Sequence, residues 1–160
     1  MRACCTRWML ALCLSWTAPA QRHSFKQYDS DEGLTSPVVT NLLQDRTGFL
    51  WAGTHSGLIR YDGARFRHFG KSDGLPSAEI RSLHETVDGT LWVGTRTGLA
   101  RRRGDRFEAV PLGASVEIRG RSALASDASG RLYVGVTEGL AVVPPAELVQ
   151  IGRASCRERV

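Results

Sequence analysis

Three pairs of polar residues stand inside a repeated frame, and their side chains suit hydrogen bonding and charge recognition. The frame reads Gly-Thr-x-x-Gly-Leu in its first two copies, and the variable pairs are His55-Ser56, Arg96-Thr97 and Thr137-Glu138. Their charge changes from copy to copy while the glycines around them stay fixed. Loops on a rigid scaffold commonly carry binding residues. These six residues are therefore the candidate ligand-binding residues, and the alternative is that they are ordinary solvated turns.

Catalytic and metal-binding patterns are otherwise lacking in the sequence. None of the four histidines has metal-ligand spacing with a cysteine or carboxylate; they are His23, His55, His68 and His84. The segments Asp45 to Gly48 and Asp88-Gly89 lack the further acidic ligands that calcium needs, so they are interpreted as turns. The sequence has no Gly-x-Ser-x-Gly nucleophile elbow and no phosphate-binding loop. We therefore expect no enzyme activity, no metal and no cofactor.

The frame that holds the polar pairs recurs every 41 residues. An aromatic residue, a glycine two positions later and a second glycine recur together; they are Trp51, Gly53 and Gly57, then Trp92, Gly94 and Gly98, then Tyr133, Gly135 and Gly139. The three copies cover residues 33–70, 74–110 and 117–149. A fixed period of about 40–45 residues is typical of propellers and some solenoids.

Each copy divides into four short runs of β-forming residues. In the first copy these are Val38–Gln44, Phe49–Gly53, Leu58–Tyr61 and Arg65–Phe69, separated by Asp-x-x-Gly and Asp-Gly turn sequences. The pattern predicts an all-β fold of propeller blades, each with four antiparallel strands. Three blades cannot close a ring, so we expect an incomplete propeller over residues 21–150.

The repeated aromatic and glycine positions have expected roles in packing. Trp51, Trp92 and Tyr133 are predicted to pack between neighbouring blades, and Gly53 and Gly94 to lie where two sheets approach closely. The polar pairs then fall in the turn between the second and third strands. In a propeller this turn shares a face with the loop that joins successive blades.

The two ends of the chain do not follow the repeat. Residues 1–20 have the features of a signal peptide: Arg2 and Arg7, an apolar run, and Ala18-Pro19-Ala20 before the cleavage site. Residues 151–160 are basic, out of register and similar to adapter-derived tails on unrelated fragments, so we expect them to be non-native. Much of the net charge of +5 belongs to these ends. We interpret the run Arg101–Arg103 as a solvated strand end and expect no nucleic-acid partner.

The segments LWAGTHSGLIRYDG (50–63) and LWVGTRTGLARRRGDRF (91–107) resemble the two-component regulator propeller repeat. The third copy departs from it, with Tyr133 for tryptophan, Val136 for threonine and Pro144-Pro145 in place of Asp-Gly. The resemblance covers about residues 28–143. It implies a periplasmic sensor region of a membrane receptor, whose output is a histidine kinase or a diguanylate cyclase. It also implies an unidentified small-molecule or glycan ligand.

The sequence thus favours the N-terminal fragment of an exported sensor that continues into an inner-membrane receptor through a C-terminal region missing from this chain. Two alternatives stay open, a protein-interaction propeller and a secreted glycan-active enzyme. The enzyme would need paired carboxylates on the face that carries the variable turns. On that face the sequence indicates Glu138 alone.

Overall fold

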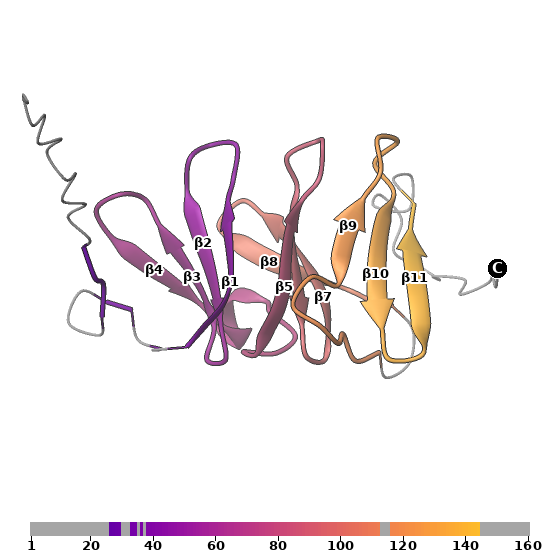
Figure 1. The fold of residues 1–160 in the computed structure, drawn as a ribbon, viewed down its shortest axis with the longest axis horizontal. Coiled ribbons are helices and arrows are strands. Elements are labelled where there is room, and N and C mark those ends of the chain that lie inside the picture. Colours follow the sequence, from indigo (N-terminus) through magenta and orange to yellow (C-terminus); the bar gives the residue numbers. More distant parts are fainter. Residues whose placement is uncertain (1–25, 30–32, 35, 37, 113–115, 145–160) are drawn as a thin grey trace, which may run out of the picture.

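The computed structural model describes residues 26–29, 33–34, 36, 38–112 and 116–144. These residues form three antiparallel sheets that stand side by side (Figure 1). The first sheet comprises β1 (Val39–Gln44), β2 (Leu50–Thr54), β3 (Leu58–Tyr61) and β4 (Phe66–Phe69). The second comprises β5 (Ile80–Glu85), β6 (Leu91–Thr95), β7 (Gly98–Arg103) and β8 (Arg106–Val110). The third comprises β9 (Leu124–Ser126), β10 (Leu132–Val136) and β11 (Gly139–Val143).

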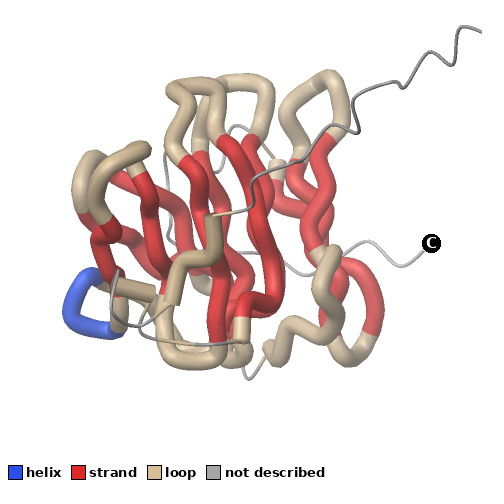
Figure 2. The backbone as a smooth tube through the Cα atoms, turned by 60° about the vertical axis from the view of Figure 1, so that its left-hand side comes forward, coloured by secondary structure: helices blue, strands red, loops and turns tan. Residues whose placement is uncertain are grey.

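Every sheet is a meander, because its strands are paired in the order of the sequence. A short 3-10 helix, Lys71–Asp73, lies in the connection from the first sheet to the second (Figure 2). The predicted blades of four antiparallel strands are confirmed for the first two repeats. In the third repeat three strands lie within the described residues. The rest of that repeat after residue 144, the expected signal peptide at 1–20 and the expected non-native tail at 151–160 lie outside them.

Apolar side chains fill the space between successive sheets. Trp51 is fully buried, with its ring centroid 5.6 Å from that of Phe69 and 6.2 Å from that of Phe107 in the next sheet. Trp92 is also fully buried and belongs to a second cluster with Ile118 and residues of the third sheet. The prediction that these two tryptophans pack between blades is confirmed. Tyr133, the third aromatic of the series, is partly buried.

The glycine two positions after each tryptophan faces the next sheet. A Cβ on Gly53 would lie 2.7 Å from Cγ2 of Ile80, the first residue of the second sheet. A Cβ on Gly94 would lie 3.4 Å from Cδ1 of Ile118, at the start of the third repeat. The expected approach, too close for a side chain, is therefore confirmed at Gly53, whereas at Gly94 the added Cβ would make an ordinary van der Waals contact.

A polar group six residues before each aromatic residue holds the first turn of the blade and the ring together. The Asp45 carboxylate accepts hydrogen bonds from the Thr47 and Phe49 amides, both at 3.0 Å, and from Trp51 Nε1 at 2.8 Å. Burial opposes its charge, but these hydrogen bonds and one from the Thr47 hydroxyl outweigh it and lower the pKa of Asp45.

The same anchor recurs in the other two blades with altered chemistry. In the second blade Thr86 Oγ1 accepts the hydrogen bond from Trp92 Nε1 at 3.3 Å. In the third blade the Asp127 carboxylate accepts from the Tyr133 hydroxyl at 3.2 Å. A hydrogen bond from Ser129 is the largest of several causes that lower the pKa of Asp127. The interpretation of Asp45 as a turn residue is correct but incomplete, because its carboxylate also satisfies a buried indole.

The basic run is not a solvated strand end. Arg101 is buried and its Nη2 lies 2.9 Å from the Glu108 carboxylate. The Arg102 guanidinium lies over the Trp51 ring, 5.2 Å from its centroid. Arg103 alone of the three is exposed. Two of these arginines therefore belong to the packing of the first and second blades, which corrects the interpretation made from the sequence.

One contact between the second and third sheets should make stability depend on pH near neutrality. His84 Nε2 lies 2.8 Å from Ser126 Oγ, and burial lowers the pKa of His84 although the Glu85 carboxylate opposes this. The unfolded chain then takes up a proton more readily than the folded chain as the pH falls below the ordinary value of 6.5. We expect the free energy of unfolding to decrease between pH 7.5 and 5.5. The glutamine in His84→Gln cannot titrate, so this variant should lose less free energy of unfolding between the two pH values than the unmodified chain, as measured by urea unfolding. An equal loss in both proteins would contradict this role of His84.

Candidate functional site

The turns that bear the six candidate residues lie along one edge of the row of sheets, at the bottom of Figure 1. We call this edge the lower face; it carries the β2–β3, β6–β7 and β10–β11 turns. The connections between blades reach the same face, because the Arg96 amide donates to the Glu79 carbonyl at 2.9 Å and the Thr137 amide to the Glu117 carbonyl at 3.1 Å. The expected sharing of one face by these turns and connections is confirmed.

Charged side chains on the lower face form a continuous series across the three blades. His55 Nδ1 of the first blade lies 3.5 Å from Glu79 Oε1, and Arg96 Nη1 of the second lies 3.7 Å from Glu79 Oε2. Arg96 Nε in turn lies 3.5 Å from Glu117 Oε1, at the start of the third repeat. We call these four residues the charged series. It joins two of the variable turns and two connections in a single polar surface.

Two further arginines extend the charged series. Arg81 Nη2 lies 2.6 Å from Glu79 Oε1, and Arg119 Nη2 lies 3.6 Å from Glu117 Oε2. The side chains of His55 and Arg96 are 50% and 57% exposed, so a ligand can reach both of them. The surface therefore offers guanidinium donors and carboxylate acceptors at adjacent positions.

The carboxylates on this face include two that the sequence did not indicate. Glu138 is exposed as expected, but Glu79 and Glu117 stand on the same face. The interpretation that Glu138 is alone there is therefore wrong. Glu79 and Glu117 are 38 positions apart, whereas the repeat is 41, so the period could not reveal their equivalence.

Ser56, Thr97 and Thr137 are also candidate residues, and each either makes a local hydrogen bond or lines a surface cavity. The Ser56 amide donates to Thr54 Oγ1 at 3.1 Å, and the Thr137 hydroxyl donates to the Glu117 carbonyl at 3.1 Å. Ser56 lines a cavity of about 370 Å³, and Thr97 lines another of about 290 Å³. The structure thus brings His55 and Arg96 into the charged series and places Ser56 and Thr97 beside it.

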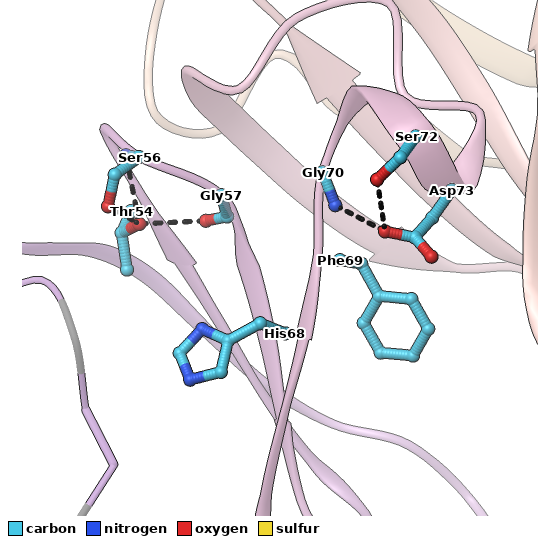
Figure 3. A pocket seen from close by; sticks show the side chains of 8 residues that line it. All are labelled: Thr54, Ser56, Gly57, His68, Phe69, Gly70, Ser72 and Asp73. Carbon is cyan, nitrogen blue, oxygen red and sulfur yellow. Dashed lines mark hydrogen bonds between the residues drawn. The ribbon is translucent and has the colours of Figure 1, made fainter.

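The two cavities occupy the same place in successive blades but differ in chemistry. The first has polar walls from His68, Ser72 and Asp73, and Asp73 accepts a hydrogen bond from the Gly70 amide at 2.8 Å (Figure 3). The second has apolar walls, which include Val110 and Leu112. The first and second blades therefore present different chemistry at this position.

The first strands of the first two sheets, β1 and β5, carry buried polar atoms that have no hydrogen-bond partner in the described part of the chain. They are Asn41 Oδ1, Arg81 Nε and Ser82 Oγ, on β1 and β5. Asn41 and Ser82 are equivalent positions of the repeat, which the sequence alone did not single out. Buried polar atoms normally have a hydrogen-bond partner. This region next to the lower face therefore offers donors and acceptors that could form further hydrogen bonds.

Within residues 26–29, 33–34, 36, 38–112 and 116–144, no three histidine, cysteine or acidic side chains come together in a way that could hold a metal ion. In the same part of the chain, no helix has the length and apolar character required to cross a membrane.

Comparison with known proteins agrees with this architecture. The family model described as two component regulator propeller matches residues 33–56 and 74–97. The extracellular domain of the putative hybrid two component system BT3049 of B. thetaiotaomicron superposes with a TM-score of 0.65 at 21% identity, over 84% of this chain and 21% of that one. That of BT4673 from the same organism gives 0.56 at 27% identity, over 65% and 15%.

A curated relative, Histidine kinase P4 of Formosa agariphila, is 36% identical over 56 residues, which is 35% of this chain and 4% of the relative. The chain therefore spans only a small part of the length of the proteins it matches. The matched residues of the family model contain the Trp51 and Trp92 strands and the turns that bear His55 and Arg96. Residues 33–56 and 74–97 thus match the two-component regulator propeller repeat.

Proposed function

We propose that this chain is part of an extracytoplasmic sensor propeller of a two-component signalling receptor, and that the lower face binds its ligand. The observation that carries the proposal is the charged series, in which variable turn residues of two blades meet across the connections. The likeness to extracellular domains of hybrid two-component systems supports the extracytoplasmic placement. The histidine kinase relative favours a kinase over a diguanylate cyclase as the output.

The energetics of the charged series fit recognition better than stabilisation. Exposed ion pairs contribute about 0–1 kcal/mol each because water screens them. The carboxylates of Asp45 and Asp127 hold the turns and aromatic rings of their blades, and we expect Arg96 and His55 to add little to the stability of the fold. Side chains that add little stability and differ between otherwise similar blades are suited to binding.

The chemistry of the series suits a small molecule or glycan with several hydroxyl or anionic groups. Arg96 and Arg81 supply planar guanidinium donors, and Glu79 and Glu117 supply acceptors. Both carboxylates lie beside arginines, which favours binding over a role as a catalytic proton donor. A protein partner on the same face is the alternative. Identifying the molecule that binds this face would distinguish a small-molecule or glycan ligand from a protein partner.

The test uses the complete receptor in membrane vesicles and measures autophosphorylation while a panel of oligosaccharides, amino acids and organic acids is added. We expect Arg96→Ala and His55→Ala to shift the response to the active compound to at least about tenfold higher concentration, equivalent to about 1.4 kcal/mol of binding free energy. Arg106→Ala is the matched control, because Arg106 is exposed at the opposite end of the second sheet. Equal responses in all variants would place the ligand elsewhere.

A further inference from the structure

Two arginines stand directly opposite each other on neighbouring strands of the first sheet. Arg60 on β3 is the register partner of Arg67 on β4. Like charges in directly opposite positions destabilise an antiparallel pair of strands. One period later, the same two positions hold Arg101 and Glu108, whose side chains form an ion pair at 2.9 Å. The second sheet therefore neutralises its arginine across the strands, whereas the first sheet places a second cation there.

A third guanidinium group reaches this pair from the second sheet. Arg60 and Arg102 lie on the same ring, with their guanidinium carbons 5.9 and 5.2 Å from the centroid of Trp51. The guanidinium carbon of Arg67 lies 4.8 Å from the centroid of Phe69. Both rings are buried, so these cation–π contacts fix the guanidinium groups in place. We call Arg60, Arg67 and Arg102 the arginine cluster.

The carboxylate of Asp105 lies against the arginine cluster. Asp105 Oδ2 is 3.1 Å from Arg67 Nη1, and Asp105 Oδ1 is 3.8 Å from Arg60 Nη1. A hydrogen bond from Arg67 and the charge of that arginine, followed by the charges of Arg60 and Arg102, lower the pKa of Asp105. The cluster therefore favours a negatively charged oxygen group at this position.

Asp105 is less buried than two of the three arginines that surround it. It stands next to Gly104 in the β7–β8 turn, and its side chain is 66% exposed, against 15% for Arg60 and 25% for Arg102. Ion pairs of so exposed a carboxylate contribute little stability, because water screens them. Rotation of this one exposed side chain is therefore enough to open the arginine cluster to another anion.

The charge of the arginine cluster suits a dianion. With Asp105 rotated away, the three cations face the single carboxylate of Asp45, whose Oδ2 lies 3.9 Å from Arg102 Nη1. Asp45 is buried and already accepts the hydrogen bond from the Trp51 indole. A surplus of two positive charges then remains. A phosphate monoester carries about two negative charges at neutral pH, and its oxygens accept bidentate hydrogen bonds from guanidinium groups.

We propose that Arg60, Arg67 and Arg102 form a binding site for a phosphate monoester, and that the Asp105 carboxylate occupies this site until the ligand displaces it. The β7–β8 turn that carries Asp105 is at the opposite end of β7 from the lower face, so the site is separate from the charged series. It joins the first sheet to the second, so a bound phosphate ties the two blades together. The phosphate belongs either to a soluble compound or to a lipid headgroup.

The test is calorimetric titration of the complete receptor, in detergent micelles, with phenyl phosphate. We expect Arg67→Gln, at a side chain that is 44% exposed, to weaken binding by at least about tenfold. Asp105→Asn removes the competing carboxylate and should strengthen binding by about threefold or more. Asp88→Asn is the matched control, because it removes the same charge from a turn where Thr86 and Thr90 hold the carboxylate, and it should bind as the unmodified receptor does.

Mixed micelles that contain phosphatidic acid, whose headgroup is a phosphate monoester, separate the two sources. Binding of phenyl phosphate in plain micelles supports a soluble ligand, and binding only in the presence of phosphatidic acid supports a lipid headgroup. The proposal is overturned if neither probe binds, if Arg67→Gln binds as tightly as the unmodified receptor, or if Asp105→Asn gives no gain. Urea unfolding of each variant shows that the fold is intact. Neither probe depends on the lower face, so failure of the sensor proposal would not imitate failure of this one.

Discussion

Replacing Gly74 by alanine is expected to destabilise the fold by about 4 kcal/mol or more, and Gly63→Ala by only about 1–2 kcal/mol. Both glycines have a φ near +100°, so both substitutions carry the backbone strain of a left-handed residue. A Cβ on Gly63 meets open space, whereas a Cβ on Gly74 would overlap the carbonyl oxygen of Phe107. The difference between the two variants isolates the close approach of the connection to the second sheet.

Urea unfolding followed by tryptophan fluorescence measures both variants on one scale. Trp51 lies in the cluster that includes Phe107, so loss of this contact changes its emission. Similar midpoints for Gly63→Ala and Gly74→Ala would show that the two blades are not packed through this connection.

Replacing Asp45 by alanine is expected to cost about 3 kcal/mol at pH 7. The change removes the acceptor of two backbone amides and leaves Trp51 Nε1 buried without a partner, and an unsatisfied buried donor alone costs about 1–3 kcal/mol. Asp62→Ala is the control, because Asp62 also accepts two backbone amides but lies in an exposed turn. Its effect on the unfolding midpoint should be small.

The cost of Asp45→Ala should also depend on pH in a defined direction. The folded-state pKa of Asp45 is below its ordinary value of 3.8, so its contribution is complete above that value and is lost as the pH falls through the folded-state pKa. The gap in free energy of unfolding between the wild-type chain and Asp45→Ala should therefore narrow below about pH 4. A gap that stays constant from pH 7 to pH 3 would contradict the hydrogen-bonded carboxylate.

The repeat made the blade architecture predictable because backbone turns and close contacts demand particular residues at fixed offsets. Gly53 and Trp51 recur at one period since each faces the next sheet in the same way. The expected strand from Leu58 to Tyr61 agrees with β3, and the other boundaries in the first blade differ by at most one residue. The anchor residue before each aromatic was harder to predict, because either a carboxylate or a hydroxyl can accept the hydrogen bond from the ring. The anchor changes from Asp45 to Thr86 and back to Asp127, although its spacing of six residues before each aromatic was visible.

The candidate site was predicted only in part. The variable turns pointed to His55 and Arg96, but their carboxylate partners lie in connections of unequal length, where the period is lost. The buried position of Arg101 was missed because a run of three arginines indicates exposure, whereas Glu108 on the adjacent strand of the same sheet pairs with its guanidinium.

The most direct test of a ligand site on the lower face is calorimetric titration of the complete extracytoplasmic region with the compound that activates the receptor. We expect Arg96→Ala to weaken the measured affinity by at least about tenfold, His55→Ala to weaken it as well, and Arg106→Ala to bind as the wild type does. All three variants should unfold at similar urea concentrations, because exposed ion pairs add little stability. Unchanged affinity in Arg96→Ala and His55→Ala, with the fold intact, would contradict a ligand site on the lower face.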